Sequence, residues 1–114
     1  MMRRGDILLV EFDPVRPDEA NKVRPAVVVS NDGANRSAEK QGRGVISVLP
    51  VTTNVEKVYS FQVLLEDVGL RTESKVQTEQ IRSVSISRVR RTIGRVPAAT
   101  MAEVDRVLRL HLGL

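Results

Sequence analysis

The sequence predicts an α+β domain, in which a small, curled antiparallel sheet or barrel carries one helix near the C-terminal end of the chain. Five or six short segments rich in Val, Ile and Leu alternate with polar turns, and a helical pattern follows the last of them. With 114 residues and no internal repeat or linker, the chain is predicted to form one domain over residues 1–114. A domain of this size can bury roughly two-thirds of its unfolded surface, so it needs no disulfides to form a core.

The predicted strands are short apolar runs, and side chains along a strand alternate between two faces. In residues 44–51, Val45 and Leu49 share one face, while Ile46 and Val48 share the other. The predicted strands cover residues 5–12, 25–30, 44–51, 61–65, 75–81 and 93–96.

Two polar segments between these strands predict loops. Residues 13–23 contain two prolines and mixed charges, which indicates a surface loop. Residues 31–43 are polar and contain Gly33 and Gly42, which predicts a second loop that could include a helical turn near residues 37–40.

The last segment predicts a helix with two alternative starts. Pro97 suits the first helical position, whereas Thr100 and Glu103 fit a capping box, and these two signals leave the start open. One face of this helix collects Met101, Val104, Val107, Leu108 and His111.

The chain is basic, with a net charge of +4 and an isoelectric point of about 10.1. Only four of its 18 basic residues are lysines, a ratio that a genome-wide bias toward arginine codons would also explain. A basic excess favours a polyanionic partner, most simply nucleic acid. Aromatic residues make up 3% of the chain and none is tryptophan, which argues against recognition by broad base stacking.

The composition also bears on location. The absence of cysteine excludes a disulfide framework and thiolate chemistry, and it favours a cytoplasmic protein. The apolar run at residues 7–10 is far too short for a signal peptide or a membrane span, so no membrane association is expected.

Most kinds of catalytic site are excluded or weakly supported. One histidine and no cysteine cannot form a zinc cluster, and a Ser-His-Asp arrangement could use only His111 on the predicted apolar face. The glycine-containing segment 42–44 lacks the lysine and hydroxyl of a phosphate-binding loop. Glu66 and Asp67 precede Gly69 and are typical of a turn. We therefore predict neither a metal nor a cofactor.

Two polar strand ends remain as the candidate site. Arg24 begins one strand, and Thr52 and Thr53 end the next. If these strands lie side by side, a guanidinium and a hydroxyl meet at one rim of the sheet, a pairing that suits a phosphate. Glu19 and the polar pair at residues 79–80 are further candidates. Each also has an ordinary explanation as a solvated charge, a strand-forming residue or a solubilising loop residue.

Several short motifs follow one another along the chain. They are residues 4–7 (Arg-Gly-Asp-Ile), 12–14 (Phe-Asp-Pro), Glu19, 24–30 (Arg-Pro-Ala-Val-Val-Val-Ser), 50–53 (Pro-Val-Thr-Thr), 59–63 (Tyr-Ser-Phe-Gln-Val), 79–83 (Glu-Gln-Ile-Arg-Ser) and 93–96 (Ile-Gly-Arg-Val). No single motif is specific, but the ordered series spans nearly the whole chain and resembles the MazF/PemK family of toxin endoribonucleases.

The resemblance implies an SH3-like barrel with a C-terminal helix, working as a homodimer. It also implies metal-independent, sequence-selective cleavage of single-stranded RNA. In family terms Arg24 and Thr52 are the essential catalytic residues, and Glu19 is a supporting acidic residue of a loop. An acidic antitoxin would block the same groove, and DNA would be bound only indirectly, through the toxin–antitoxin complex.

The segments expected to select the RNA sequence are the loops at residues 13–23 and 54–60. The expected RNA contacts are Thr53, Asn54, Lys57, Arg16, Lys22 and Gln80.

Two other functions fit the same fold. A toxin that traps DNA gyrase and cuts nothing is known for a tryptophan-containing C-terminus, whereas this chain has no tryptophan and ends in Leu112-Gly113-Leu114. A degenerate SH3-like module would bind RNA or antitoxin without cleavage.

Overall fold

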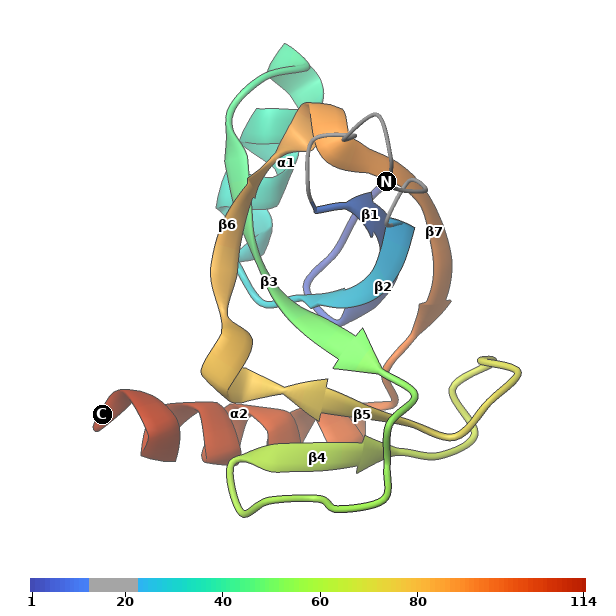
Figure 1. The fold of residues 1–114 in the computed structure, drawn as a ribbon. Helices are drawn as coiled ribbons and strands as arrows, with labels where there is room; N and C mark the ends of the chain where they lie inside the picture. Colours follow the sequence, from blue (N-terminus) through green and yellow to red (C-terminus); the bar gives the residue numbers. More distant parts are fainter. Residues whose placement is uncertain (13–22) are drawn as a thin grey trace.

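A computed structural model describes residues 1–12 and 23–114. Within these residues the strands form one curled antiparallel sheet, and two helices pack against it (Figure 1). The elements in chain order are β1 (Asp6–Glu11), β2 (Val23–Val28), α1 (Asp32–Gln41), β3 (Val45–Thr52), β4 (Gln62–Leu65), β5 (Ser74–Gln77), the 3₁₀ turn η1 (Thr78–Gln80), β6 (Arg82–Ser85), the 3₁₀ turn η2 (Ile86–Arg88), β7 (Val89–Arg95) and α2 (Ala98–Leu112).

The sheet is strongly curled, and β3 lies at its centre. Hydrogen-bonded neighbours follow the order β4-β5-β3-β2-β1-β7, and β6 also pairs with β3 (Figure 1). Residues 45–48 of β3 pair with β6, residues 48–50 pair with β2, and residues 51–52 pair with β5. The predicted α+β class, with a small barrel-like antiparallel sheet and a C-terminal helix, is therefore confirmed, although the hydrogen-bonded path among the described strands does not close.

Buried side chains form two clusters on opposite faces of the sheet, as the alternation predicts. In β3, Ile46 and Val48 join the cluster that faces α1 and β6, whereas Leu49 and Val51 join the cluster that faces α2, β4 and β5. From α2 the second cluster receives Met101, Val104, Val107 and Leu108. His111, expected on the same helical face, is exposed in the last turn.

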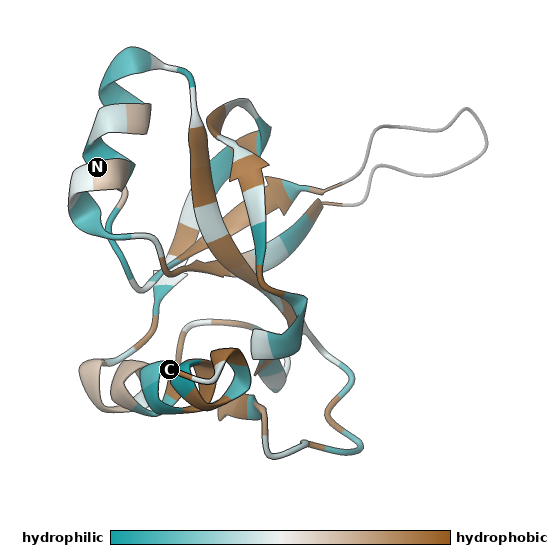
Figure 2. Cartoon of the chain, turned by 90° about the vertical axis from the view of Figure 1, so that its left-hand side faces the viewer, coloured by the Kyte–Doolittle hydropathy of each residue, from teal (hydrophilic) through white to brown (hydrophobic). Residues whose placement is uncertain are grey.

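Helix α1 is a correction to the predicted loop at residues 31–43. Ten residues are helical, not one turn, and both ends are capped. The Asn31 side chain accepts a hydrogen bond from the Ala34 N–H at 2.8 Å, and Gly42 ends the helix with a left-handed φ of 66°. Figure 2 shows α1 mainly in the hydrophilic colour, and Asn35 and Ala38 are its buried residues. The helix was missed because it has no apolar stripe.

Polar contacts hold α1 against the sheet. Ser30 Oγ donates to Asn35 Oδ1 at 2.5 Å, and Asn35 Nδ2 donates to the Ser30 carbonyl at 2.9 Å. The Ser47 N–H of β3 donates to the same Ser30 hydroxyl at 3.1 Å, so the fully buried Asn35 is connected to the sheet. At the helix start, the Asp32 carboxylate accepts from the Arg4 N–H, which lowers the pKa of Asp32.

Two further strand predictions are corrected in the second half of the chain. The single strand expected at residues 75–81 is β5, which ends at Gln77 and is followed by η1, and β6 comes next. The short strand expected at residues 93–96 begins earlier, at Val89, because β7 pairs with β1 from Val10↔Val89 to Asp6↔Arg95. Exposed arginines interrupt the apolar pattern of β7 and hid its first half.

The start of α2 lies near Pro97. Pro97 is the residue before the first helical turn, and its carbonyl accepts the Met101 N–H at 2.8 Å. Thr100 is inside the helix, so the capping box is wrong. No helix in the described ranges is long and apolar enough to cross a bilayer.

We expect Asn35→Ala to lower the free energy of unfolding by about 1–3 kcal/mol, because it leaves the hydroxyl and carbonyl of Ser30 without their partner. Urea denaturation followed by circular dichroism measures the change. Arg36→Ala on the exposed side of the same helix is the control, with an expected change within about 0.5 kcal/mol. Equal losses in the two variants would show that the polar contacts do not hold α1 in place.

Candidate functional site

Arg24 lies at the start of β2, on the exposed rim of the sheet. Its backbone is fixed by pairing with Val10 of β1, and the next residue, Pro25, pairs with Leu9. Three of the predicted site residues, Arg16, Glu19 and Lys22, lie outside the described residues.

Thr52 ends β3 at the same rim. The pairing of β2 with β3 ends at Ala26↔Pro50, so Arg24 and Thr52 each lie two residues beyond the last paired residue of their strand, at adjoining strand ends. Both residues also fall on the same face by alternation, two positions from Ala26 and Pro50 respectively. The side-by-side strands expected from the sequence are therefore present.

The chain turns sharply after Thr52. Thr52 Oγ1 accepts a hydrogen bond from the Asn54 N–H at 3.2 Å, and Asn54 Oδ1 accepts from the Glu56 N–H at 3.4 Å. Such side-chain turns fix the hydroxyl oxygen while its own proton stays available for donation. Thr53, the neighbouring hydroxyl, is exposed. Thr52 is therefore the better-placed hydroxyl donor at this rim.

Lys75 lies directly opposite Thr52, in β5, and the sequence analysis did not select it. Its side chain is buried, with 6% exposure, and its Nζ donates to the Lys57 carbonyl at 2.5 Å. A pocket of about 470 Å³ opens here, lined by Asn54, Glu56, Lys57, Tyr59 and Lys75. In the sequence Lys75 is only the first residue of the predicted strand at residues 75–81, and nothing there indicates that its side chain is buried.

Tyr59 is the aromatic residue that lines this pocket. Its ring stacks on Phe61, with centroids 5.3 Å apart and planes 2° from parallel. The Lys57 and Lys75 ammonium groups lie 4.8 Å and 5.7 Å from the Tyr59 ring centroid. Cations at these distances are attracted by the face of an aromatic ring.

A buried polar chain supports this tyrosine. The Tyr59 N–H donates to Gln62 Oε1 at 3.1 Å, and Gln62 Nε2 donates to Glu79 Oε2 at 2.8 Å. The other oxygen, Glu79 Oε1, is buried and accepts no hydrogen bond from the described residues. Glu79 therefore supports the segment before β4, whereas the neighbouring Gln80 is exposed on η1.

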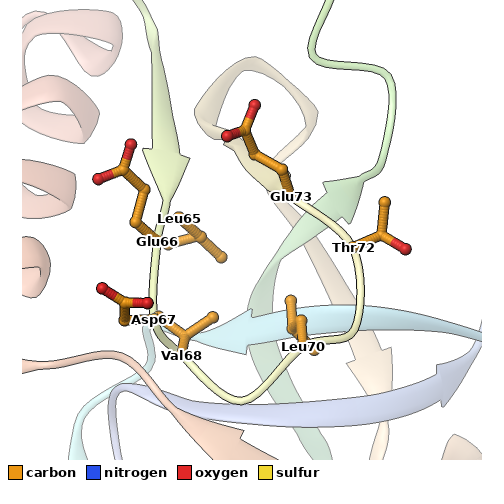
Figure 3. A pocket seen from close by; sticks show the side chains of 7 residues that line it. All are labelled: Leu65, Glu66, Asp67, Val68, Leu70, Thr72 and Glu73. Carbon is orange, nitrogen blue, oxygen red and sulfur yellow. The ribbon is translucent and has the colours of Figure 1, made fainter.

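A second pocket, of about 300 Å³, lies in the β4–β5 connection and has the opposite charge (Figure 3). Glu66, Asp67 and Glu73 present carboxylates around it. Asp67 has a left-handed φ of 54° and Gly69 one of 87°, which confirms the predicted turn. Within the described residues no group of three His, Cys, Asp or Glu side chains could hold a metal. An acidic pocket does not suit an RNA phosphate.

Comparison with known proteins places the chain in a family. Residues 3–112 match the profile described as "PemK-like, MazF-like toxin of type II toxin-antitoxin system". The chain belongs to this family of toxins. It is 58% identical over 116 residues to endoribonuclease MazF9 of Mycobacterium tuberculosis, covering 100% of this chain and 98% of that protein. It is also 29% identical to endoribonuclease MazF of Staphylococcus epidermidis, covering 100% and 93% of the two chains.

Solved structures of MazF-like toxins share the fold. A MazE–MazF crystal structure from Deinococcus radiodurans matches with a TM-score of 0.78 and 28% identity, over 99% of this chain and 96% of that one. A mycobacterial endoribonuclease in complex with its cognate antitoxin matches with a TM-score of 0.77 and 22% identity, over 100% and 97%. The resemblance read from the sequence motifs is thus confirmed.

We expect Gln62→Ala in this MazF-like toxin to loosen the backbone at Tyr59, and so the packing of its ring, and to lower the free energy of unfolding by about 1–3 kcal/mol, since the Tyr59 N–H loses its acceptor and Glu79 loses its donor. Tyr59 is the only tyrosine and the chain has no tryptophan, so the near-ultraviolet circular dichroism of tyrosine reports on this ring alone. The band should weaken in Gln62→Ala and persist in Gln41→Ala, an exposed glutamine of α1. An unchanged band would contradict the supporting role of Gln62.

Proposed function

We propose that this MazF-like toxin is an endoribonuclease that cleaves single-stranded RNA at selected sequences, without a metal, and thereby inhibits translation and growth. The observation that supports the proposal is the antiparallel pairing of β2 with β3, because Arg24 is near the start of the first strand and Thr52 is at the end of the second. The full-length similarity to proteins named endoribonucleases supports the choice of RNA as the substrate.

The reaction can use the nucleophile that RNA itself carries. The 2′-oxygen attacks the adjacent phosphorus, its bond to phosphorus forms, and the bond from phosphorus to the 5′-oxygen breaks. The 2′-hydroxyl loses a proton to a base, and the departing 5′-oxygen takes up a proton from solvent. The products are a 2′,3′-cyclic phosphate and a 5′-hydroxyl. DNA lacks the 2′-hydroxyl and is not a substrate.

Arg24 and Thr52 stabilise the negative charge that develops on the phosphate. The planar guanidinium of Arg24 can bind two phosphate oxygens at once, and the Thr52 hydroxyl donates a further hydrogen bond to a phosphate oxygen. Arginine stays protonated at any working pH, so Arg24 acts as an electrostatic clamp and not as the base. Glu19, a carboxylate of the segment that precedes β2, is the proposed base.

The proposed RNA contacts come from the segment before β2, the segment after β3, and the turn η1. Thr53, Asn54 and Lys57 follow β3, and Gln80 lies on η1. The further proposed contacts are Arg16 and Lys22, which together with Lys57 offer positive charge to the RNA backbone. Sequence selection is proposed to lie in the segments at residues 13–23 and 54–60, which carry Arg16, Lys22 and Lys57.

The toxin is proposed to act as a homodimer in the cytoplasm and to be inhibited by an acidic antitoxin. A solved structure of the same fold contains a mycobacterial endoribonuclease in complex with its cognate antitoxin, and a crystal structure contains MazE and MazF. An acidic, partly disordered segment that folds on binding suits the basic rim. DNA binding would come through that complex. Action on gyrase is not favoured, since the chain has no tryptophan.

The first test of this function is cleavage of a long single-stranded RNA in EDTA. We expect discrete cuts by the wild type, and a loss of about 10²–10³-fold in kcat for Arg24→Ala and Thr52→Val, each of which removes a donor to the phosphate. Arg71→Ala and Thr72→Val, at exposed positions to which no RNA contact is assigned, are the matched controls and should keep most of the activity. Cutting that survives in Arg24→Ala, or that requires added magnesium, would overturn the mechanism.

The role of Glu19 predicts a pH dependence. A general base must be ionised, so kcat/KM should fall as the pH drops through the pKa of the catalytic carboxylate. We expect Glu19→Gln to lower kcat/KM by about 10²-fold or more. The fall at low pH, which is the acidic limb of the pH–rate profile, should be absent in this variant. Asp18→Asn is the neighbouring control and should keep the limb. A limb that is the same in Glu19→Gln and the wild type would assign the base to another group.

A further inference from the structure

The Lys75 ammonium is a buried charge that has no acidic partner among the described residues. The side chain is 6% exposed and lies in β5 between the buried residues Ser74 and Val76. Its contacts are the Lys57 carbonyl, 2.5 Å from Nζ, and the Tyr59 ring. None of the ion pairs in residues 1–12 and 23–114 includes Lys75. A buried ammonium in such surroundings is destabilising.

The same group is well suited to bind an anion. An ammonium carries three donors, and one of them is used by the Lys57 carbonyl. The second ammonium, that of Lys57, lies over the same tyrosine ring. Both side chains line the 470 Å³ pocket, and the Glu56 carboxylate that also lines it forms no salt bridge with either lysine. Two converging positive charges beside a pocket match a phosphate better than a neutral base.

The location of the pocket identifies which phosphate. Lys75 pairs with Thr52 across the β3–β5 ladder, so the pocket is next to the proposed scissile phosphate and on the side away from Arg24. We propose that Lys75 and Lys57 bind the RNA phosphate that adjoins the scissile one. This subsite rests on the proposed RNA cleavage, and it adds Lys75 and a defined chemical contact to that function.

The Gln62–Glu79 pair makes the subsite rigid. Gln62 accepts from the Tyr59 N–H and donates to Glu79, which fixes the backbone at Tyr59. The Tyr59 ring stacks on Phe61 and lies near both ammonium groups. Lys57 is exposed and can adjust to the strand, whereas Lys75 is fixed by its burial. Lys75 is therefore the part of the subsite that is organised before RNA binds.

The test uses the full chain and an RNA that contains the mapped cut site, with a 2′-deoxynucleotide at the attacking position so that it binds without being cut. Its dissociation constant is measured against salt concentration. For a single strand the slope of log K against log[salt] should become shallower by about 0.7 in Lys75→Met and in Lys57→Met. Lys40→Met, on the exposed side of α1, should leave the slope unchanged.

A second measurement locates the phosphate. Oligonucleotides with one neutral methylphosphonate at successive positions are bound to each protein. At the position next to the cut, the substitution should weaken binding by wild type roughly tenfold and have little further effect on Lys75→Met. If the methylphosphonate weakens RNA binding by the wild type and by Lys75→Met equally at every position, the subsite is overturned.

The variants also distinguish misfolding and a wrong function from a wrong subsite. Since methionine removes a buried charge and keeps the length of the side chain, Lys75→Met should unfold at a temperature no lower than wild type. If Lys75→Met fails to fold, the same methylphosphonate comparison is made between wild type and exposed Lys57→Met. Wild-type protein that cuts no RNA would overturn the proposed function. Wild type that cuts, with an unchanged salt slope in the lysine variants, would overturn the subsite alone.

Discussion

Strand β3 is the constraint on which the rest of the structure depends. It pairs with β2, β5 and β6, and its alternate residues enter the two buried clusters, so neither face is free to slip. If the register of β3 shifted by one residue, Ile46 and Val48 would move to the face of Leu49 and Val51, and the reverse. The same shift would turn the Thr52 hydroxyl away from the Arg24 side of the sheet. The geometry of the rim is therefore fixed by apolar packing, several residues away from the polar groups themselves.

The parts of the fold that could be predicted from sequence are those with a periodic apolar pattern. The alternation in β3 and the apolar face of α2 were sufficient to predict these two elements. The ends of the strands predicted at residues 25–30 and 44–51 indicated Arg24 and Thr52 as candidate site residues. Helix α1 could not be predicted in this way, because its contact with the sheet is a hydrogen-bonded network around Asn35. The strand predicted at residues 75–81 joined β5 to the 3₁₀ turn η1, and β6 was not predicted, since only the tertiary structure shows its pairing with β3. The family motifs added the roles, which local pattern does not contain.

Lys75 was missed for a related reason. In the sequence it is a single charge at the edge of a predicted strand, and such residues are ordinarily solvated. Its burial follows from the Tyr59 segment, which crosses beside β5 and places the Lys57 carbonyl on the ammonium. Charge along this part of the chain also changes over a few residues, from the acidic pocket that includes Glu73 to the basic pocket of Lys75. This arrangement favours a polyanion on one side of β5 and disfavours it on the other.

Two unfavourable polar groups therefore lie close to the candidate site: an ammonium without an acidic partner and the Glu79 oxygen without a donor, both among the described residues. Apolar side chains at these positions would stabilise the fold more. Buried polar groups without partners occur most often at functional sites, where the ligand requires them. The two groups act on one residue, because Glu79 reaches the Tyr59 backbone N–H through Gln62 and the Lys75 ammonium lies near the Tyr59 ring. A ligand that supplies negative charge to this pocket would compensate the buried ammonium, and the unbound toxin would be less stable than the RNA-bound one. Binding and folding are then linked through a side chain that touches neither Arg24 nor the cleaved bond.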